Sequence, residues 1–254
     1  LIPNVPGNAL DTEIYENYQK GSYFLSSGHD GFMRELVSMP LDRVVPYENI
    51  DEKVASICEF VSVGVHAVER FLKISHSRRD VIGIWGDGSL AYVVACVLSK
   101  KLPSSKIIVM GRSTDKLSRF SFVYKTYLSD DVPKDFEIDH AFECAGGEGS
   151  YFAIDDIIKY INPQGTALLM GVSENKVAVN TRDVLEKGIS LIGSSRSGRA
   201  NFEEAVSIMS DSETQRRLSA IIYEDDCVRN VSDIHRVFEN DLQTQFKTAF
   251  KWNI

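Results

Sequence analysis

The chain has 254 residues, of which 43% are hydrophobic and 25% are charged, and its formal net charge is −8. This composition is ordinary for a globular protein with a sizeable core, built as one large domain or as two smaller ones. The negative charge argues against a nucleic-acid partner, and the lack of any run of about 18 apolar residues argues against a membrane partner.

The first 50 residues contain four of the seven prolines and show no long periodic pattern. Short apolar runs at 36–38 and 43–45 look like strands, and the polar, aromatic stretch 11–20 is predicted to be a loop or a single helical turn. This part of the chain is too irregular to supply a complete domain core by itself.

From Asp51 to Leu72, apolar residues recur every three or four positions, which predicts a helix with Asp51 as its N-cap. After a polar connection at 73–80, short strands alternate with helices, as in a parallel, doubly wound sheet. We expect strands at 81–85, 106–111, 123–128, 138–144, 166–170 and 189–193. We expect helices at 91–99, 114–120, 151–161 and 180–187, and a turn at 162–165. The tail adds predicted helices at 202–209 and 231–240 and a strand at 246–252.

The turn after the first predicted strand, Gly86-Asp87-Gly88-Ser89-Leu90-Ala91, fits the G-x-G-x-x-G/A pattern of a dinucleotide-binding fold. The first glycine allows a tight turn, and the second lets the backbone approach a pyrophosphate. Amide groups at the start of the next helix, together with its dipole, then hold the phosphates. The predicted cofactor contacts in this turn are Gly86, Asp87, Gly88, Ser89 and Leu90. The alternative is an ordinary structural glycine turn.

The end of the second predicted strand indicates which nicotinamide cofactor is used. An NAD site places a carboxylate there, whereas NADP needs a cation for its 2′-phosphate. The chain reads Met110-Gly111-Arg112-Ser113-Thr114, with Lys116 one turn later and no carboxylate at the strand tip. A guanidinium suits a phosphate through paired, charge-assisted hydrogen bonds. We therefore predict NADPH, bound by Arg112, Ser113 and Lys116; the alternative is a solvated arginine.

The chain contains four cysteines, which are far apart in the sequence: Cys58, Cys96, Cys144 and Cys227. Their spacing fits neither a disulfide framework nor a zinc knuckle. Because no signal peptide is visible either, we expect a cytoplasmic location. The chain begins with Leu1 rather than Met, so we expect the gene product to start upstream.

Several segments resemble the medium-chain, zinc-type alcohol and polyol dehydrogenases and follow that family's order. They are Gly31–Glu35 with Asp42–Pro46, Cys58–Ala67, Phe142–Gly147, Pro163–Thr166 and Gly193–Ser195. Within this family, three features look most like the ribulose-5-phosphate reductases, also called ribitol-5-phosphate dehydrogenases. These features are Arg112, the turn at Trp85–Gly88 and the run Ser26–Gly31.

The resemblance implies an α/β fold, namely a Rossmann-type doubly wound parallel sheet plus part of a GroES-like catalytic domain. It implies a partial GroES-like domain at 1–60, an NADP-binding domain at 61–200, and a segment at 201–254 that returns to the catalytic domain. Members of the family usually pair through the edge strand of the cofactor sheet, here 189–193. A homodimer is therefore expected.

The implied activity is the NADPH-dependent reduction of a ketose phosphate. The substrate implied by the branch is D-ribulose 5-phosphate, reduced to D-ribitol 5-phosphate for CDP-ribitol synthesis in teichoic-acid or capsule formation. Four residues at the end of the fourth predicted strand are expected to line the cofactor crevice: Cys144, Ala145, Gly146 and Gly147. The alternative for this segment is an ordinary turn. No catalytic residue is identified.

Catalytic zinc in this family is held mainly by residues that lie upstream of this chain's first residue. By resemblance, Glu59 is the one expected ligand present, although a helix-capping or dipole-compensating role is equally open. Zinc normally takes four ligands, so we predict that this chain alone holds no zinc and does not turn over.

Other polar residues are weaker candidates. Ser194, Ser195, Arg196 and Arg199 follow the sixth predicted strand, where they could touch the nicotinamide ribose or a substrate phosphate, or simply face solvent. His29 lies in a loop of small residues and is a candidate for substrate contact. His66 lies in a predicted apolar helix, where a packed, hydrogen-bonded histidine is more common than a catalytic one. Two other functions stay open: a zinc-independent quinone or enoyl reductase, and a non-catalytic NADP-binding module.

Overall fold

A computed structural model describes residues 1–7, 11 and 13–254, and the chain divides into two compact units. The sheet unit comprises residues 67–195, and the terminal unit comprises residues 1–66 together with 196–254. Helix α2 (Cys58–Ile74) runs through the boundary between them. None of the helices in the described part of the chain has the length and hydropathy needed to cross a membrane.

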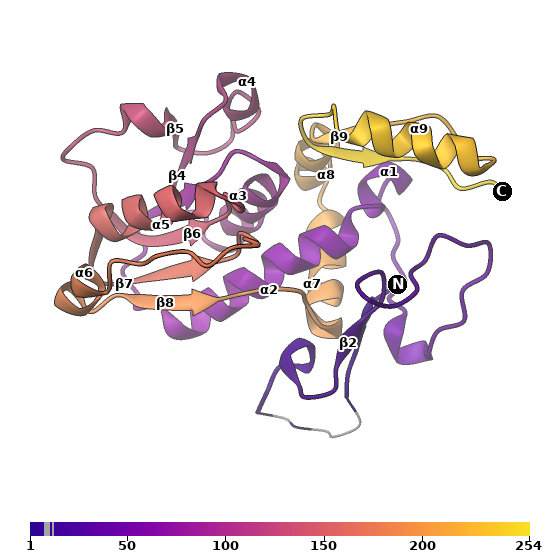
Figure 1. Ribbon diagram of the computed structural model, residues 1–254, viewed down its shortest axis with the longest axis horizontal. Helices are drawn as coiled ribbons and strands as arrows, with labels where there is room; N and C mark the ends of the chain where they lie inside the picture. Colours follow the sequence, from indigo (N-terminus) through magenta and orange to yellow (C-terminus); the bar gives the residue numbers. More distant parts are fainter. Residues whose placement is uncertain (8–10, 12) are drawn as a thin grey trace. The chain divides into compact units, whose positions relative to one another are not determined.

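The sheet unit contains six parallel strands in the order β5-β4-β3-β6-β7-β8 (Figure 1). Their bounds are β3 (Val81–Trp85), β4 (Lys106–Gly111), β5 (Lys125–Leu128), β6 (Ile138–Glu143), β7 (Ile161–Leu169) and β8 (Ser190–Gly193). Within this sheet, the first strand along the chain is β3, and β4 and β5 follow outward on one side of it. The chain then returns to the other side of β3, where β6, β7 and β8 form the second half of the sheet. The strand order therefore reverses between β3 and β6. This topology confirms the predicted doubly wound parallel sheet.

Helices cover both faces of this sheet. They are α3 (Ser89–Lys101), α4 (Thr114–Leu117), α5 (Gly149–Tyr160) and α6 (Thr181–Lys187), with a 3₁₀ turn η3 (Ser129–Asp131). The Phe71 ring of α2 lies 4.9 Å from the His140 ring and 5.2 Å from the Phe142 ring of β6. Ala141, between them, packs in a buried cluster with Ala153 and other residues of α5. Because alternate strand residues point to opposite faces, α2 and α5 cover opposite sides of β6.

Strand β7 differs from the prediction of a turn at 162–165 followed by a strand from Thr166. It begins at Ile161, which pairs with Ile138, and the register then jumps so that His140 pairs with Thr166. Residues 162–165 are therefore a bulge within the strand. Ile161 is 2% exposed, and its burial beside Ile138 explains why pairing starts so early.

The terminal unit has short strands and many polar turns. Its elements are β1 (Asn4–Val5), η1 (Glu16–Tyr18), β2 (Tyr23–Phe24), η2 (Leu41–Arg43), α1 (Glu52–Ala55), α7 (Arg199–Met209), α8 (Ser212–Ser219), β9 (Ile222–Glu224), α9 (Val231–Asp241) and β10 (Lys247–Ala249). Strand β1 pairs antiparallel with β2, and β9 pairs in parallel with β10.

Two predictions for the terminal unit need correction, and a third, the single helical turn expected within 11–20, is confirmed for the described residues. The strands expected at 36–38 and 43–45 do not form, and Arg43 instead ends the 3₁₀ turn η2. The helix expected from Asp51 is interrupted after α1, although the Asp51 side chain does cap it by accepting a hydrogen bond from Lys53 N at 2.9 Å. The stretch 11–20 contains Thr12, which lies outside the described residues; within it, η1 is the helical turn.

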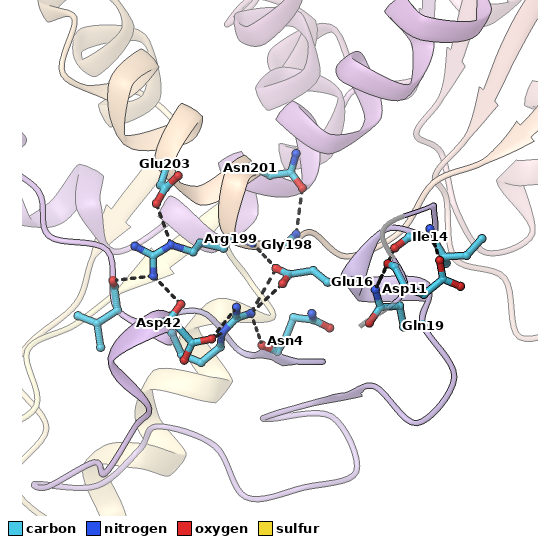
Figure 2. A network of polar contacts seen from close by, with 12 residues as sticks. Asn4, Asp11, Ile14, Glu16, Gln19, Asp42, Gly198, Arg199, Asn201 and Glu203 are labelled. Carbon is cyan, nitrogen blue, oxygen red and sulfur yellow. Dashed lines mark hydrogen bonds and ion pairs between the residues drawn. The ribbon is translucent and has the colours of Figure 1, made fainter. Parts of the chain in front are cut away.

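A buried ionic network joins distant segments of the terminal unit. Arg43 is 5% exposed, and its guanidinium donates to Glu16 at 3.2 Å and to the carbonyl oxygen of Asn4 at 3.2 Å. Figure 2 shows the Glu16 carboxylate also accepting the backbone N–H of Arg199, at the start of α7. The Arg199 guanidinium in turn donates to the carbonyl oxygen of Asp42. The network fixes the start of α7 to Glu16 and to the Asp42–Arg43 segment.

Candidate cofactor site

The glycine turn after β3 leaves space for a ligand above the start of α3. Gly86 has a φ of +131°, and a Cβ there would lie 2.8 Å from the carbonyl oxygen of Cys144, so no larger residue fits. A Cβ at Gly88 would meet nothing within 4 Å. No side chain caps α3 at Gly88, which leaves the first-turn amides near Ser89 and Leu90 for an anion. The local geometry fits a bound pyrophosphate.

Asp87 connects this turn to the end of β4. Its Oδ2 accepts the backbone N–H of Arg112 at 2.7 Å and that of Ser113 at 2.8 Å. A Cβ at Gly111 would lie 2.5 Å from the Asp87 side chain, so the glycine makes room for this contact. Asp87 was predicted to contact the cofactor directly; the hydrogen bonds of the structure show that it positions the loop that follows β4.

The loop after β4 carries two cations that have no acidic partner among the described residues. Arg112 is exposed and Lys116 is half-buried. Ser113 caps the short helix α4, where its Oγ accepts the N–H of Lys116 at 3.3 Å. With no carboxylate to neutralise it, a guanidinium held on an ordered loop is suited to a phosphate monoester.

The third part of the candidate site is the turn after β6. Cys144 is buried, and burial raises the pKa of its thiol well above the usual range, so it stays a neutral thiol rather than a reactive thiolate. Gly146 and Gly147 have φ values of +68° and +55°, which favour glycine. Ala145 is exposed. The turn presents backbone rather than side-chain groups to solvent.

The sheet topology brings these three parts together. Trp85, the last residue of β3, pairs with Met110 of β4 on one side and with Glu143 of β6 on the other. The glycine turn, the Arg112 loop and the Ala145–Gly147 turn therefore leave the same carboxyl edge of three neighbouring strands. Ligands of doubly wound sheets bind at this edge, where the strand order reverses.

Sequence reasoning did not single out Glu143. Its side chain is 1% exposed, and its carboxylate accepts hydrogen bonds from Ala145 N, Gly146 N and Gly171 N. An acidic residue within a predicted parallel strand was the available signal, because such strands are buried and a buried carboxylate needs partners.

The two arginines after β8 have different surroundings. The guanidinium of Arg199 is hydrogen-bonded within the terminal unit. It donates to Asp42 O, and its Nε donates to Glu203 at 2.8 Å. Arg196 is exposed, has a φ of +60°, and places its guanidinium 5.2 Å from the centre of the Phe24 ring. No carboxylate pairs with Arg196 among the described residues, so it is the more available of the two cations.

The two serines after β8 and the two candidate histidines differ in their burial. Ser194 is buried and Ser195 is exposed. His29 is exposed and lies against Tyr23, with ring centres 4.5 Å apart. His66 is fully buried, and its Nε2 lies 3.2 Å from Asn17 Nδ2. The surroundings of His66 are those of a packed, hydrogen-bonded core histidine.

Glu59, the candidate zinc ligand, lies half-buried in the first turn of α2. Burial raises the pKa of its carboxyl, and the charge of Lys247 partly opposes that shift. Across the described residues, no group of three or more His, Cys, Asp or Glu side chains is arranged to hold a metal ion. The described residues therefore do not form a complete zinc site.

Comparison with known sequences gives several matches of high identity. The chain is 55% identical over 254 residues to a ribulose-5-phosphate reductase of Streptococcus pneumoniae, covering 100% of this chain and 73% of that protein. It is 46% identical over 255 residues to ribulose-5-phosphate reductase 1 of Staphylococcus aureus, covering 99% of this chain and 74% of that protein. No protein-family model matches the chain.

Solved structures support the same relationship. The structure of S. aureus TarJ in complex with NADPH matches with a TM-score of 0.85 and 43% identity, covering 89% of this chain and 72% of that chain. An L-idonate 5-dehydrogenase from Escherichia coli matches with a TM-score of 0.81, covering 98% of this chain and 74% of that chain. Its identity of 19% means that this second likeness concerns the fold alone.

Proposed function

The chain belongs to the ribulose-5-phosphate reductase family, and we propose that its protein reduces D-ribulose 5-phosphate to D-ribitol 5-phosphate with NADPH. The observation that carries this proposal is the 55% identity along the whole chain to a reductase of that name. The TarJ complex with NADPH, at 43% identity, supports the choice of cofactor. The resulting alditol phosphate would serve CDP-ribitol synthesis for teichoic acids or capsules.

NADPH supplies the hydride that reduces the ketone. In this proposal, the chain binds and orients the cofactor. The amides at the start of α3 hold the pyrophosphate, and Gly88 lets the backbone come close to it. Arg112 and Lys116 bind the 2′-phosphate, and the Ala145–Gly147 turn lies at the crevice between the two halves of the sheet. The proposed cofactor residues are those predicted from the sequence.

We propose that Arg196 recognises the phosphate of the substrate. The guanidinium is exposed beside Phe24 and has no acidic partner in the described part of the chain, which leaves it able to bind a phosphate. Arg199 is a weaker choice, because its hydrogen bonds to Asp42 and Glu203 already occupy it.

Further parts of the proposal concern assembly and context. Strand β8 is an edge of the six-stranded sheet, and pairing of two such edges would give a homodimer. We assign the terminal unit to a partial GroES-like domain and propose Glu59 as one ligand of a zinc ion. The cysteines form no disulfide among the described residues, which agrees with a cytoplasmic location.

The test is NADPH oxidation by the complete protein, with D-ribulose 5-phosphate compared to unphosphorylated D-ribulose. We expect the phosphorylated ketose to react with a kcat/KM at least about tenfold higher, the effect of one charge-assisted contact. The Arg196→Gln variant should narrow that preference and leave the KM for NADPH unchanged. Faster reaction of quinones or simple ketoses would contradict the proposal, and NADPH binding without any turnover would indicate a binding module.

A further inference from the structure

Glu143 is a buried carboxylate that is held by hydrogen bonds rather than by a cation. It is 1% exposed, and none of the described lysines or arginines lies within ion-pair distance of it. Its Oε1 accepts Ala145 N at 2.9 Å, Gly146 N at 3.1 Å and Ser150 Oγ at 3.2 Å. Its Oε2 accepts Gly171 N at 2.8 Å. These four donors offset the cost of burying the charge.

The donors come from three separate segments, which Glu143 holds together. Ala145 and Gly146 belong to the turn after β6, Ser150 to the first turn of α5, and Gly171 to the backbone just after β7. The packing is close, because a Cβ at Gly171 would lie 2.4 Å from Oε1 of Glu143. The carboxylate is therefore built into the carboxyl edge of the sheet, beneath the turn.

This arrangement determines which groups the turn can offer to a ligand. The N–H groups of Ala145 and Gly146 point to Glu143, and that of Gly147 donates to the carbonyl oxygen of Val172 at 2.7 Å. All three amides of the turn are thus used internally. The turn is left with carbonyl oxygens, which accept hydrogen bonds from hydroxyl or amide groups and repel phosphates.

We propose that Glu143 is a positioning residue for the nicotinamide half of NADPH. By holding the amides inward, it makes the Ala145–Gly147 turn an acceptor surface, suited to the ribose hydroxyls and the carboxamide NH₂. The 2′-phosphate of the adenosine half finds its cations instead on the Arg112 loop. This inference rests on the proposed function, because it takes NADPH as the ligand.

The Glu143→Gln variant of the complete protein tests this inference. Glutamine keeps the shape of the side chain, but its NH₂ group would face either the Ala145 and Gly146 amides or the Gly171 amide, donor against donor. Binding is measured by fluorescence titration with NADPH and, separately, with adenosine 2′,5′-bisphosphate, which lacks the nicotinamide half. We expect NADPH binding to weaken about tenfold or more, and binding of the bisphosphate to change less than about twofold.

Two further variants keep the result interpretable. Glu148→Gln removes an exposed carboxylate five residues along the same turn and should bind both ligands like the wild type. Ser150→Ala removes one donor and should weaken NADPH binding in the same direction by a smaller factor, which covers the case of Glu143→Gln failing to fold. Equal weakening for both ligands, or none for either, would overturn the positioning role. Lack of NADPH binding by the wild type would instead overturn the proposed cofactor.

Discussion

The two units of the chain depend on different interactions. In the sheet unit, apolar strands and helices form a continuous buried cluster, and the buried acids Asp139 and Glu143 accept hydrogen bonds from backbone amides. In the terminal unit, strands are two or three residues long, and the buried Arg43–Glu16 pair joins segments that no long strand connects. Apolar side chains are buried in both units, but in the terminal unit a buried charged network also joins segments that are far apart in the sequence.

The strongest test of this contrast is Arg43→Ala. Removing the guanidinium leaves the Asn4 carbonyl without its donor and the Glu16 carboxylate without its cation inside the terminal unit. Breaking a buried pair from one side typically lowers the free energy of unfolding by 3–5 kcal/mol, and we expect about 4 kcal/mol here. Urea unfolding, followed by circular dichroism, measures the loss.

Arg34→Ala is the matched control, because Arg34 pairs with Asp30 in the same unit but is 46% exposed, and its partner is 96% exposed. Exposed pairs contribute roughly 0–1 kcal/mol. If Arg43→Ala cost no more than this control, the network would be incidental and the contrast between the units would not hold.

The second prediction concerns acid sensitivity of the sheet unit through His140. This histidine is fully buried, and its Nδ1 accepts the backbone N–H of Thr166 at 3.1 Å. Burial lowers the pKa of His140 to about 4, helped by the neighbouring charge of His76 and opposed by Asp139. The unfolded chain binds a proton near pH 6.5, well before the folded chain does. Stability is thus fully present above about pH 6.5 and is lost as the pH falls toward 4.

The expected loss across this range is about 3 kcal/mol at most, from the size of the pKa difference. The measurement is the free energy of unfolding at several pH values for the wild type and for His140→Gln, which removes the titrating ring. The two curves should diverge below pH 6.5, while His29→Gln, at an exposed site, should run parallel to the wild type. Parallel curves for all three would show that His140 does not make the sheet unit acid-sensitive.

The third prediction separates binding from stability in the sheet unit. Arg112 is exposed and contributes little packing, so Arg112→Asp should leave the free energy of unfolding nearly unchanged. It should nevertheless weaken NADPH binding about 30-fold, or roughly 2 kcal/mol, because a charge-assisted contact becomes a repulsive one. Titration of the complete protein with NADPH and NADH measures the effect.

The control is Arg119→Asp, an equal charge change at an exposed site two residues after α4. Equal losses of NADPH affinity in the two variants would show that Arg112 does not bind the 2′-phosphate.

Sequence patterns located the sheet unit well, because buried parallel strands are short apolar runs bounded by glycine and polar residues. Strands β3 and β4 begin and end at the predicted residues. The bulge at 162–165 was missed because register depends on a partner strand that the local sequence does not contain. Helix α8 escaped prediction because its apolar stripe is reduced to Leu218 on an otherwise polar helix.

The candidate site was only partly predictable for a related reason. Glycine spacing and the cation at Arg112 are local signals, so the glycine turn and the loop after β4 could be proposed as cofactor contacts from the sequence. The contacts of Asp87 with the Arg112 loop and of Glu16 with Arg199 cross 25 and 183 residues of sequence, respectively. A single acidic residue has no periodicity, and its partners become apparent only when the backbone is folded.

The smallest expected effect concerns an exposed ion pair in the sheet unit. Arg182 and Glu186 pair at 2.9 Å on α6 and are 84% and 53% exposed. Their order opposes the helix dipole, since the cation lies in the first turn and the acid near the end. Exchanging them, as Arg182→Glu with Glu186→Arg, keeps the pair and reverses its orientation. We expect the free energy of unfolding to rise by about 0.5 kcal/mol, measured by urea unfolding against Arg182→Ala, which should stay within about 0.3 kcal/mol of the wild type. A loss above 1 kcal/mol in Arg182→Ala would mean that surface charge also organises the sheet unit, and the distinction between the units would narrow.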